Sequence, residues 1–317
     1  MTETNVKKSC LILLAMGGPD KNEDIPEFLR NIFSDRSIIH LPGGPMMQKP
    51  LAKLISKLRS EKVKAHYNLI GGGSPLLKWT QAQLDHIEFA LSPVISGFQG
   101  YIGMRYFKPF TENTVEQAIA DGYEKIYFLP LYPQYCKATT GSSFEVARKA
   151  LAKHPEVEAV FINNFHDYPP YIELLKKYIE QNIKGDEYLL FSAHSIPQKF
   201  VDEGDPYVEQ TKKTAQLVAG ERPYTLSFQS RTGPVTWVGP DTVETVKKLT
   251  LEGKKLFIVP ISFVCDHIET MYELDIELKE IVGEPFGKQI RRMPMFNDDP
   301  EFGQALSNLF LEYYHGK

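Results

Sequence analysis

Seven short apolar runs divide the chain, and between them lie segments whose apolar residues recur at every third or fourth position. Uninterrupted apolar runs predict buried β-strands, and a repeat near 3.6 residues predicts amphipathic helices. Strands that alternate with helices are typical of parallel sheets with crossover connections. The pattern therefore predicts an α/β fold of the doubly wound type, with strands at residues 10–16, 101–107, 125–135, 159–165, 187–195, 224–230 and 255–264.

One strand–helix–strand pattern occurs twice. Residues 101–135 and 224–264 each contain a strand followed or closed by an arginine, Arg105 or Arg231, then a helix that begins after a proline and ends near a glycine. In each segment a second strand follows, and a proline interrupts it. A repeated unit of this kind predicts two similar Rossmann-like lobes, each a parallel sheet flanked by helices. Ligands of such sheets bind at the carboxyl ends of the strands, so we expect an active-site cleft between the lobes.

The repeat also suggests where the lobes begin and end. We assign residues 1–163 to the N-terminal lobe and residues 164–301 to the C-terminal lobe. The apolar periodicity of residues 302–317 predicts a final helix. We expect this helix to pack back on the N-terminal lobe.

Residues 30–64 form a locally basic segment, with eight Lys or Arg residues against two acidic ones. Within it, apolar residues spaced i, i+3, i+4 and i+7 lie beside lysines, which predicts a basic amphipathic helix. Such a helix either packs on its own domain or lies at a membrane or at the mouth of a ligand pocket, and both alternatives stay open. The apolar positions are Leu51, Leu54, Ile55 and Leu58, and the lysines are Lys49, Lys53 and Lys57.

Composition narrows the class of protein. The 317 residues carry a formal net charge of −4 and an isoelectric point near 6.1, which does not indicate a nucleic-acid partner. No apolar run has the length of a membrane span. Cys10, Cys136 and Cys265 lack CxxC spacing, so we expect free thiols in a reducing cytoplasm.

The densest group of candidate functional residues follows the last predicted strand. Glu269, Glu273 and Glu277 are spaced i, i+4 and i+8, so on an α-helix they drift by only roughly 40° per step and share one face. No Lys or Arg lies within residues 266–277. Three carboxylates on one face repel one another, and a bound cation or a proton must offset this repulsion. A divalent metal ion is one candidate. Alternatively, Asp266 and Glu269 form a capping box and the other glutamates a solvated face.

Two further motifs adjoin predicted strands or turns. His194 closes the strand of residues 187–195, where a neutral imidazole would supply a proton acceptor and a metal ligand opposite the carboxylates. A histidine in this place can equally be structural. The GGGSP motif at residues 71–75 lacks the pattern of a phosphate-binding loop, so we expect a turn with Ser74 as a possible ligand contact.

Five motifs in order resemble the ferrochelatases, which insert Fe²⁺ into a porphyrin at the end of haem synthesis. The similarity runs from about residue 10 to about residue 310, and the family's two-lobed fold agrees with the repeat. The motifs are IGGGSP, LPLYPQY with the later TTGSS, SAHSIP, FQSRTGPVTWVGPDT and DHIETMYELDIE.

The resemblance implies a set of site residues. The family's histidine and inner-site glutamate fall on His194 and Glu269, which would be the catalytic pair. The family's carboxylate helix carries a π-type bulge, which would align its side chains better. Candidate metal contacts are His194, Glu269, Glu273, Glu277, Asp266 and His267. Candidate porphyrin contacts are Met16, Ser74, Arg105, Tyr106, Tyr135 and Ser195.

The resemblance also implies the partners. Met16 resembles the members that use protoporphyrin IX, whereas users of coproporphyrin III tend to carry a tyrosine there. Fe²⁺ would be a substrate and not a bound cofactor. We expect no iron–sulfur cluster, because no cysteine follows Cys265 and Lys137 stands where the family has a cluster cysteine. The basic segment falls on the family's apolar lip, which predicts a cytoplasmic protein with weak peripheral association with anionic membranes.

Three alternatives to this function remain at the level of the sequence. The first is a coproporphyrin III ferrochelatase. The second is a chelatase that inserts cobalt or nickel into another tetrapyrrole. The third is a carrier that binds porphyrin or haem without catalysis.

Overall fold

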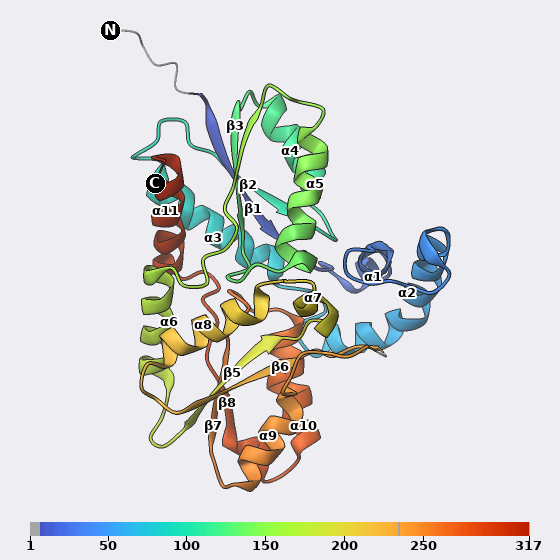
Figure 1. The fold of residues 1–317 in the computed structure, drawn as a ribbon, viewed down its shortest axis with the longest axis vertical. Coiled ribbons are helices and arrows are strands. Elements are labelled where there is room, and N and C mark those ends of the chain that lie inside the picture. Colours follow the sequence, from blue (N-terminus) through green and yellow to red (C-terminus); the bar gives the residue numbers. More distant parts are fainter. Residues whose placement is uncertain (1–6, 234, 317) are drawn as a thin grey trace.

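Two four-stranded parallel sheets form the centre of the protein in a computed structural model that describes residues 7–233 and 235–316 (Figure 1). The strand orders are β2-β1-β3-β4 and β6-β5-β7-β8, so both lobes have the same topology and the predicted α/β fold is confirmed. All seven predicted strands are present. The strands are β1 (Ser9–Ala15), β2 (Gly100–Met104), β3 (Lys125–Pro130), β4 (Glu158–Phe161), β5 (Tyr188–His194), β6 (Tyr224–Gln229), β7 (Leu256–Pro260) and β8 (Ile290–Arg292).

Helices flank both sheets, and two of them project to one side as a separate lip. The lip consists of α1 (Ile25–Ser34) and α2 (Gly44–Asn68). A nine-residue π-helix, Glu269–Glu277, follows β7 and is called the carboxylate helix below. The remaining α-helices are α3 (Leu76–Leu91), α4 (Thr111–Ala120), α5 (Ser142–Leu151), α6 (Pro169–Asn182), α7 (Gln198–Asp202), α8 (Tyr207–Ala219), α9 (Thr242–Leu251), α10 (Leu278–Val282) and α11 (Pro300–Tyr314); shorter 3₁₀ or π turns lie at Asn22–Asp24, Lys137–Gly141 and Phe286–Gln289.

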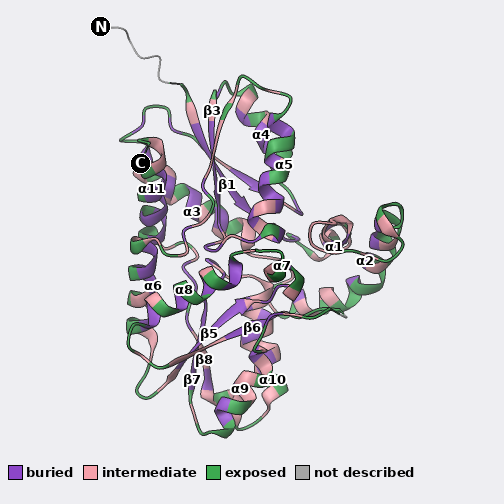
Figure 2. Cartoon of the chain, viewed as in Figure 1, coloured by how far each residue is buried: buried purple, intermediate pink, exposed green. Residues whose placement is uncertain are grey.

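The inner strands are buried on both faces. In β1 the side chains from Cys10 to Leu14 are inaccessible to solvent, and β7 is buried along its whole length. Because helices cover both faces of a parallel sheet, its central strands read as continuous apolar runs instead of alternating ones. Figure 2 shows the resulting buried centre of each lobe.

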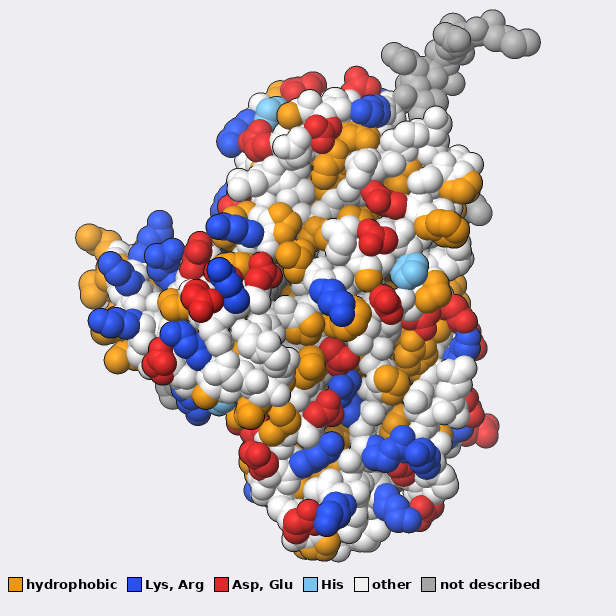
Figure 3. Space-filling view, turned by 180° about the vertical axis from the view of Figure 1, so that it is seen from behind, with side chains coloured by type: hydrophobic (Ala, Val, Ile, Leu, Met, Phe, Trp, Pro, Cys, Tyr) orange, Lys and Arg blue, Asp and Glu red, His pale blue; other side chains and the backbone are white. Residues whose placement is uncertain are grey.

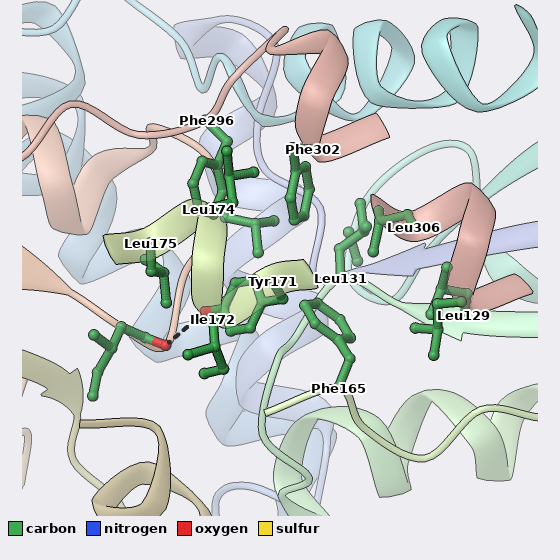
Figure 4. Packing of buried hydrophobic residues seen from close by; sticks show 14 of the residues in the cluster. Leu129, Leu131, Phe165, Tyr171, Ile172, Leu174, Leu175, Phe296, Phe302 and Leu306 are labelled. Carbon is green, nitrogen blue, oxygen red and sulfur yellow. Dashed lines mark hydrogen bonds between the residues drawn. The ribbon is translucent and has the colours of Figure 1, made fainter. Parts of the chain in front are cut away.

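One hydrophobic cluster joins the two lobes. It includes Leu129 of the first sheet and Phe191 of the second. Phe165, Tyr171 and Phe302 belong to the same cluster, and Figure 4 shows their packing. Helix α11 packs against α3 of the N-terminal part and against α6. Aromatic rings such as these each bury a large apolar area, so the lobes share a continuous core. The division of the chain at residue 163 stays a prediction.

The lip helix α2 packs on the protein mainly through small and polar residues. Besides Tyr67, its buried residues are Gln48, Ala52, Ser56 and Ser60, at spacings of four, on the helix that contacts α1. Leu54 and Leu58, two of the four positions of the predicted apolar stripe, are 53% and 72% exposed. Small residues at i and i+4 let two helices approach closely, which explains why this face is packed instead of the leucines.

The outer surface of the lip is therefore both apolar and basic. Met46 and Met47 are exposed beside the leucines, and Lys49, Lys53 and Lys57 are also exposed. Figure 3 shows the lip projecting from the body with apolar and basic side chains at its tip. None of the described helices combines the length and the apolar character needed to cross a bilayer.

Candidate active site

The carboxylate helix is a π-helix from Glu269 to Glu277, in which backbone hydrogen bonds run from residue i to i+5. The α-helical geometry assumed from spacing alone is therefore wrong, and the π-type distortion implied by the family resemblance is confirmed. Such helices are rare, because they give up packing and hydrogen-bond quality. Where they occur, they are frequently found at functional sites.

Asp266 does not cap this helix. Its backbone N–H donates to Asn297 Oδ1 at 2.8 Å, so Glu269 cannot complete a capping box there. The Asp266 carboxylate accepts from Thr270 Oγ1 at 2.9 Å and lies 3.0 Å from Arg292 Nη2. The predicted capping box is thus wrong, and Asp266 is engaged by structural partners and not by the other candidate metal contacts.

His194 and Glu269 lie together at the ends of their elements. His194 Nδ1 is 2.6 Å from Glu269 Oε2, and the two side chains are 38% and 14% exposed. Burial disfavours the histidine cation, but the charge of Glu269 and its hydrogen bond outweigh burial and raise the pKa of His194. Burial likewise opposes ionisation of Glu269, yet His194 holds the pKa of this carboxyl at about 2. At neutral pH the geometry favours an imidazolium–carboxylate pair.

Ser230 links Glu269 to Glu273. Its hydroxyl lies 2.9 Å from Glu269 Oε2 and also contacts Glu273 Oε2. A hydroxyl has one hydrogen, so it donates to one carboxyl, and the other must be protonated to donate in return. Burial, followed by the negative charge of Glu269, raises the pKa of Glu273 to about 8. Glu273 is therefore the protonated partner at neutral pH.

Ser230 and its neighbour Gln229 were not among the residues predicted from the sequence. Gln229 Nε2 donates to Glu273 Oε2 at 3.3 Å, and Ser230 has a φ of 66°, a backbone conformation uncommon for residues other than glycine. Strained backbone of this kind concentrates at functional sites. The sequence could have indicated both residues, because they end the predicted strand 224–230, which lies beside the strand that ends at His194.

The outer end of the carboxylate helix touches the lip. The ring of Tyr272 stacks on His66 of α2 with centroids 4.1 Å apart, and its hydroxyl lies 3.4 Å from Glu277 Oε1. Burial lowers the pKa of His66, which favours the neutral imidazole. His66 was not predicted either, and its contact shows that the lip and the C-terminal lobe meet at this site.

His267 is partly buried and lies near the pair of His194 and Glu269. Its Nε2 is 3.8 Å from Glu269 Oε1, and its ring packs edge-on against Phe263 at 4.4 Å. Burial lowers the pKa of His267, and its Nδ1 has no hydrogen-bond partner among the described residues. A neutral imidazole with a free nitrogen suits either a proton acceptor or a metal ligand.

The predicted metal contacts are spread along the helix. Among the residues that the structure describes, no three His, Cys, Asp or Glu side chains gather in a geometry that would hold a metal ion. The metal-binding role of these residues stays a prediction.

The predicted porphyrin contacts differ in their accessibility. Met16 is partly buried and packs against the apolar cluster of the lip, as does Ile268, which precedes Glu269. Ser74 and Tyr135 are also partly accessible. Arg105 pairs with Asp35 at 2.5 Å. The role of these side chains as ligand contacts stays a prediction.

Two predicted contacts lie deeper in the protein. Tyr106 is 1% exposed, and its hydroxyl donates to Asp35 Oδ2 at 2.7 Å. Ser195 is fully buried and donates to the carbonyl oxygen of Val238 at 2.9 Å. These hydroxyls are already paired inside the protein, which favours a structural role over direct contact with a ligand.

A surface hollow of about 980 Å³ lies along β2, between α3 and α4. Ser74 is the one predicted site residue among those that line it, and the others include Leu84, Tyr101 and Asn113. Neither His194 nor any glutamate of the carboxylate helix lines this hollow, so the side chains described above lie elsewhere in the protein.

Comparisons with known proteins agree with this arrangement. The family model for ferrochelatase matches residues 8–313. A ferrochelatase of Aquifex aeolicus is 41% identical over 311 residues, which cover 95% of this chain and 98% of that protein. A ferrochelatase of Gloeothece citriformis is 42% identical over 315 residues, covering 95% of this chain and 81% of that protein.

Solved structures show the same fold at low sequence identity. SirB from Bacillus subtilis with Fe³⁺ has a TM-score of 0.58 at 13% identity and covers 96% of this chain and 95% of its own. The sirohydrochlorin chelatase SirB from the subspecies spizizenii, in complex with cobalt, has a TM-score of 0.57 at 12% identity, with 96% and 94% covered. Together with the family match across nearly the whole sequence, these findings show that the chain belongs to the ferrochelatase family of enzymes, which insert a metal ion into a porphyrin.

Proposed function

We propose that this enzyme inserts Fe²⁺ into protoporphyrin IX with release of two protons, giving protohaem in the last step of haem b synthesis. This reaction would class it as a lyase. The observation that carries the proposal is the partly buried series of His194, Glu269 and Glu273, in which an ion pair lies beside a protonated carboxyl.

The series suits a reaction that must remove two N–H protons from a macrocycle. Glu269 is ionised and 14% exposed, so its carboxylate can accept a proton once the porphyrin displaces water, whereas the His194 imidazolium can accept one only after it has passed its own proton on. Ser230 connects Glu269 to Glu273, and protons can therefore move along this series away from the porphyrin. Binding of the macrocycle's periphery would supply the energy to distort it and expose the nitrogen lone pairs.

We assign the supply of Fe²⁺ to the outer part of the carboxylate helix. Glu277 lies beside Tyr272 and His66, where the lip meets the helix, and its oxygen atoms can hold a hydrated divalent ion. Glu273 lies between this outer position and Glu269. The metal and the protons would thus use the same row of side chains.

Met16 supports protoporphyrin IX over coproporphyrin III as the substrate. Its apolar, polarisable side chain lies against the lip cluster and would contact the face of an apolar macrocycle. An anaerobic assay with Fe²⁺ and each porphyrin in turn tests the assignment. We expect the higher kcat/KM with protoporphyrin IX, and a higher value with coproporphyrin III would reverse it. Turnover of sirohydrochlorin with Co²⁺ instead would move the enzyme to another chelatase activity.

We also propose that the protein is cytoplasmic and associates weakly with anionic membranes through the lip. The exposed Leu54 and Leu58 lie beside Lys53 and Lys57, and this pairing supports a surface that enters the headgroup region. Each lysine near an anionic surface contributes about 1 kcal/mol, so a few of them suffice for salt-sensitive binding. An apolar porphyrin would be delivered at that surface.

A further inference from the structure

Arg292 lies at the end of β8, and its guanidinium forms ion pairs with the carboxylate helix and with the residue Asp266 before it. Its side chain is 10% exposed. Its Nε lies 3.0 and 3.1 Å from the two carboxylate oxygens of Asp275, and its Nη2 donates to Asp275 Oδ2 at 2.7 Å. The same Nη2 is 3.0 Å from Asp266 Oδ1. One guanidinium therefore holds a residue before the helix and a residue inside it.

Arg292 is itself held in place by contacts with β7 and with its neighbour in the chain. Arg292 pairs with Ile258 of β7 in the sheet, and its Nη1 donates to the carbonyl oxygen of Met293 at 3.0 Å. A bidentate guanidinium–carboxylate contact fixes orientation as well as distance, and a lysine ammonium cannot reproduce it.

The contacts divide the acidic residues of this segment into two groups. Asp266 and Asp275 are paired with Arg292, whereas Glu269 and Glu273 are paired with His194, Ser230 and Gln229 at the ends of β5 and β6. The two aspartates therefore set the rotation of the helix. A slip of the helix by one residue would break the Asp275 contact and move both glutamates from their partners.

We propose that Arg292 is a positioning residue for metal insertion, which clamps the π-helix so that Glu269 and Glu273 keep their place beside His194. This inference rests on the proposed use of those two glutamates. A displacement of about 1 Å in a catalytic group can cost roughly 10²-fold in rate, so a loosened helix should lower turnover strongly.

Arg291 provides a matched control on the same strand. It forms a bidentate pair with Glu187 at 2.8 and 2.9 Å and donates to the carbonyl oxygen of Asn182 at 3.1 Å. These contacts tie β8 to the segment before β5 and do not involve the carboxylate helix. Arg291→Met therefore removes a similar ion pair from β8 without releasing the clamp.

The experiment compares Arg292→Met, Arg292→Lys and Arg291→Met in the full-length protein. We expect Arg292→Met to lower kcat at least roughly tenfold with little change in the KM for porphyrin, and Arg292→Lys to restore only part of the loss. Arg291→Met should lower Tm by a similar amount and keep kcat. Hydrogen exchange of the amides in residues 269–277 should accelerate in Arg292→Met and not in Arg291→Met.

Hydrogen exchange requires no turnover, so it tests the clamp separately from the proposed chemistry. Unchanged exchange in the carboxylate helix, or an equal loss of kcat in Arg291→Met, would overturn the inference. If Arg292→Met does not fold, Asp275→Asn gives the same test, because it removes the bidentate acceptor from the helix and leaves the arginine paired with Asp266.

Discussion

Glu269→Gln tests the active site most directly, because it keeps the shape of the side chain and removes its charge. In the parent protein this carboxylate accepts hydrogen bonds of 2.6 Å from His194 and 2.9 Å from Ser230. A glutamine can still accept through its amide oxygen. It no longer balances the His194 cation, and it cannot receive a proton from the porphyrin.

The expected effects on rate and on stability differ in size. Loss of a positioned base lowers kcat about 10²-fold or more, which corresponds to about 2.7 kcal/mol of transition-state free energy. A hydrogen bond to a charged group contributes roughly 1.5–3 kcal/mol to the free energy of unfolding, but removal of the Glu269 charge also removes the cost of burying that charge. The net loss of stability should therefore be about 1 kcal/mol, a shift in Tm of a few degrees.

Three measurements on the purified variant separate the possibilities. These are anaerobic insertion of Fe²⁺ into protoporphyrin IX, porphyrin affinity by fluorescence titration, and Tm. A stable variant that binds porphyrin and does not turn over supports the assigned role. Glu280→Gln, an exposed position in α10, is the control and should keep its activity. An active Glu269→Gln with a lowered Tm would refute the reasoning.

Three further predictions concern other parts of the protein. The native protein keeps a proton on Glu273 up to about pH 8, whereas the unfolded chain loses it near its ordinary pKa of 4.5; this group therefore costs stability as pH rises between these values, and the Tm of Glu273→Gln relative to the parent should increase over that range. A constant Tm difference would show that the pKa of Glu273 is not raised. Replacement of Leu54 and Leu58 by serine keeps the charge of the lip and should weaken co-sedimentation with anionic vesicles at low salt; unchanged binding would leave charge alone as the cause. The purified protein should show no visible absorption from an iron–sulfur cluster, and a cluster band that persists in Cys136→Ser would reveal ligands not recognised in the sequence.

The strand pattern of the sequence predicted the fold well, for a physical reason. Parallel strands covered on both faces need apolar side chains on both faces, so β1 and β7 stand out as continuous runs. β8 was missed because it has only three residues, Ile290–Arg292, and two of them are arginines whose charges are paired within the protein. Ion pairing of this kind leaves no periodic pattern in the sequence.

In the lip and in the carboxylate helix, the periodicity of the sequence did not predict which helix face is packed or which type of helix forms. The spacing of Leu54 and Leu58 identified an apolar stripe, but it could not say whether the stripe meets the protein or the solvent. Small residues at Ala52 and Ser56 decided the packing, and they carry a weak hydrophobic signal. The π-helix likewise depends on contacts from distant residues, so spacing alone assigned the α-helical geometry.

The rule that ligands bind at the carboxyl ends of parallel strands correctly placed His194 beside Glu269. His194 ends β5 and the carboxylate helix follows β7, its neighbour in the sheet, so the two were expected at one edge. β6 is the other neighbour of β5, and its end carries Gln229 and Ser230. Both side chains are polar but uncharged, so they were not selected as candidates from the sequence. In the structure they contact Glu269 and Glu273 directly.

The sequence suggested a metal because acidic residues of this segment would repel one another. In the structure, other residues of the protein and a proton offset this repulsion. Arg292 supplies a cation to Asp266 and Asp275, and it comes from a strand outside the segment in which no Lys or Arg was found. His194 supplies a second cation to Glu269, and a proton neutralises Glu273. Repulsion therefore carries no argument for a resident metal here. If a divalent ion enters this row as a substrate, as proposed, it meets a carboxyl that must first release its proton, so metal entry and proton release would be coupled at the same side chain.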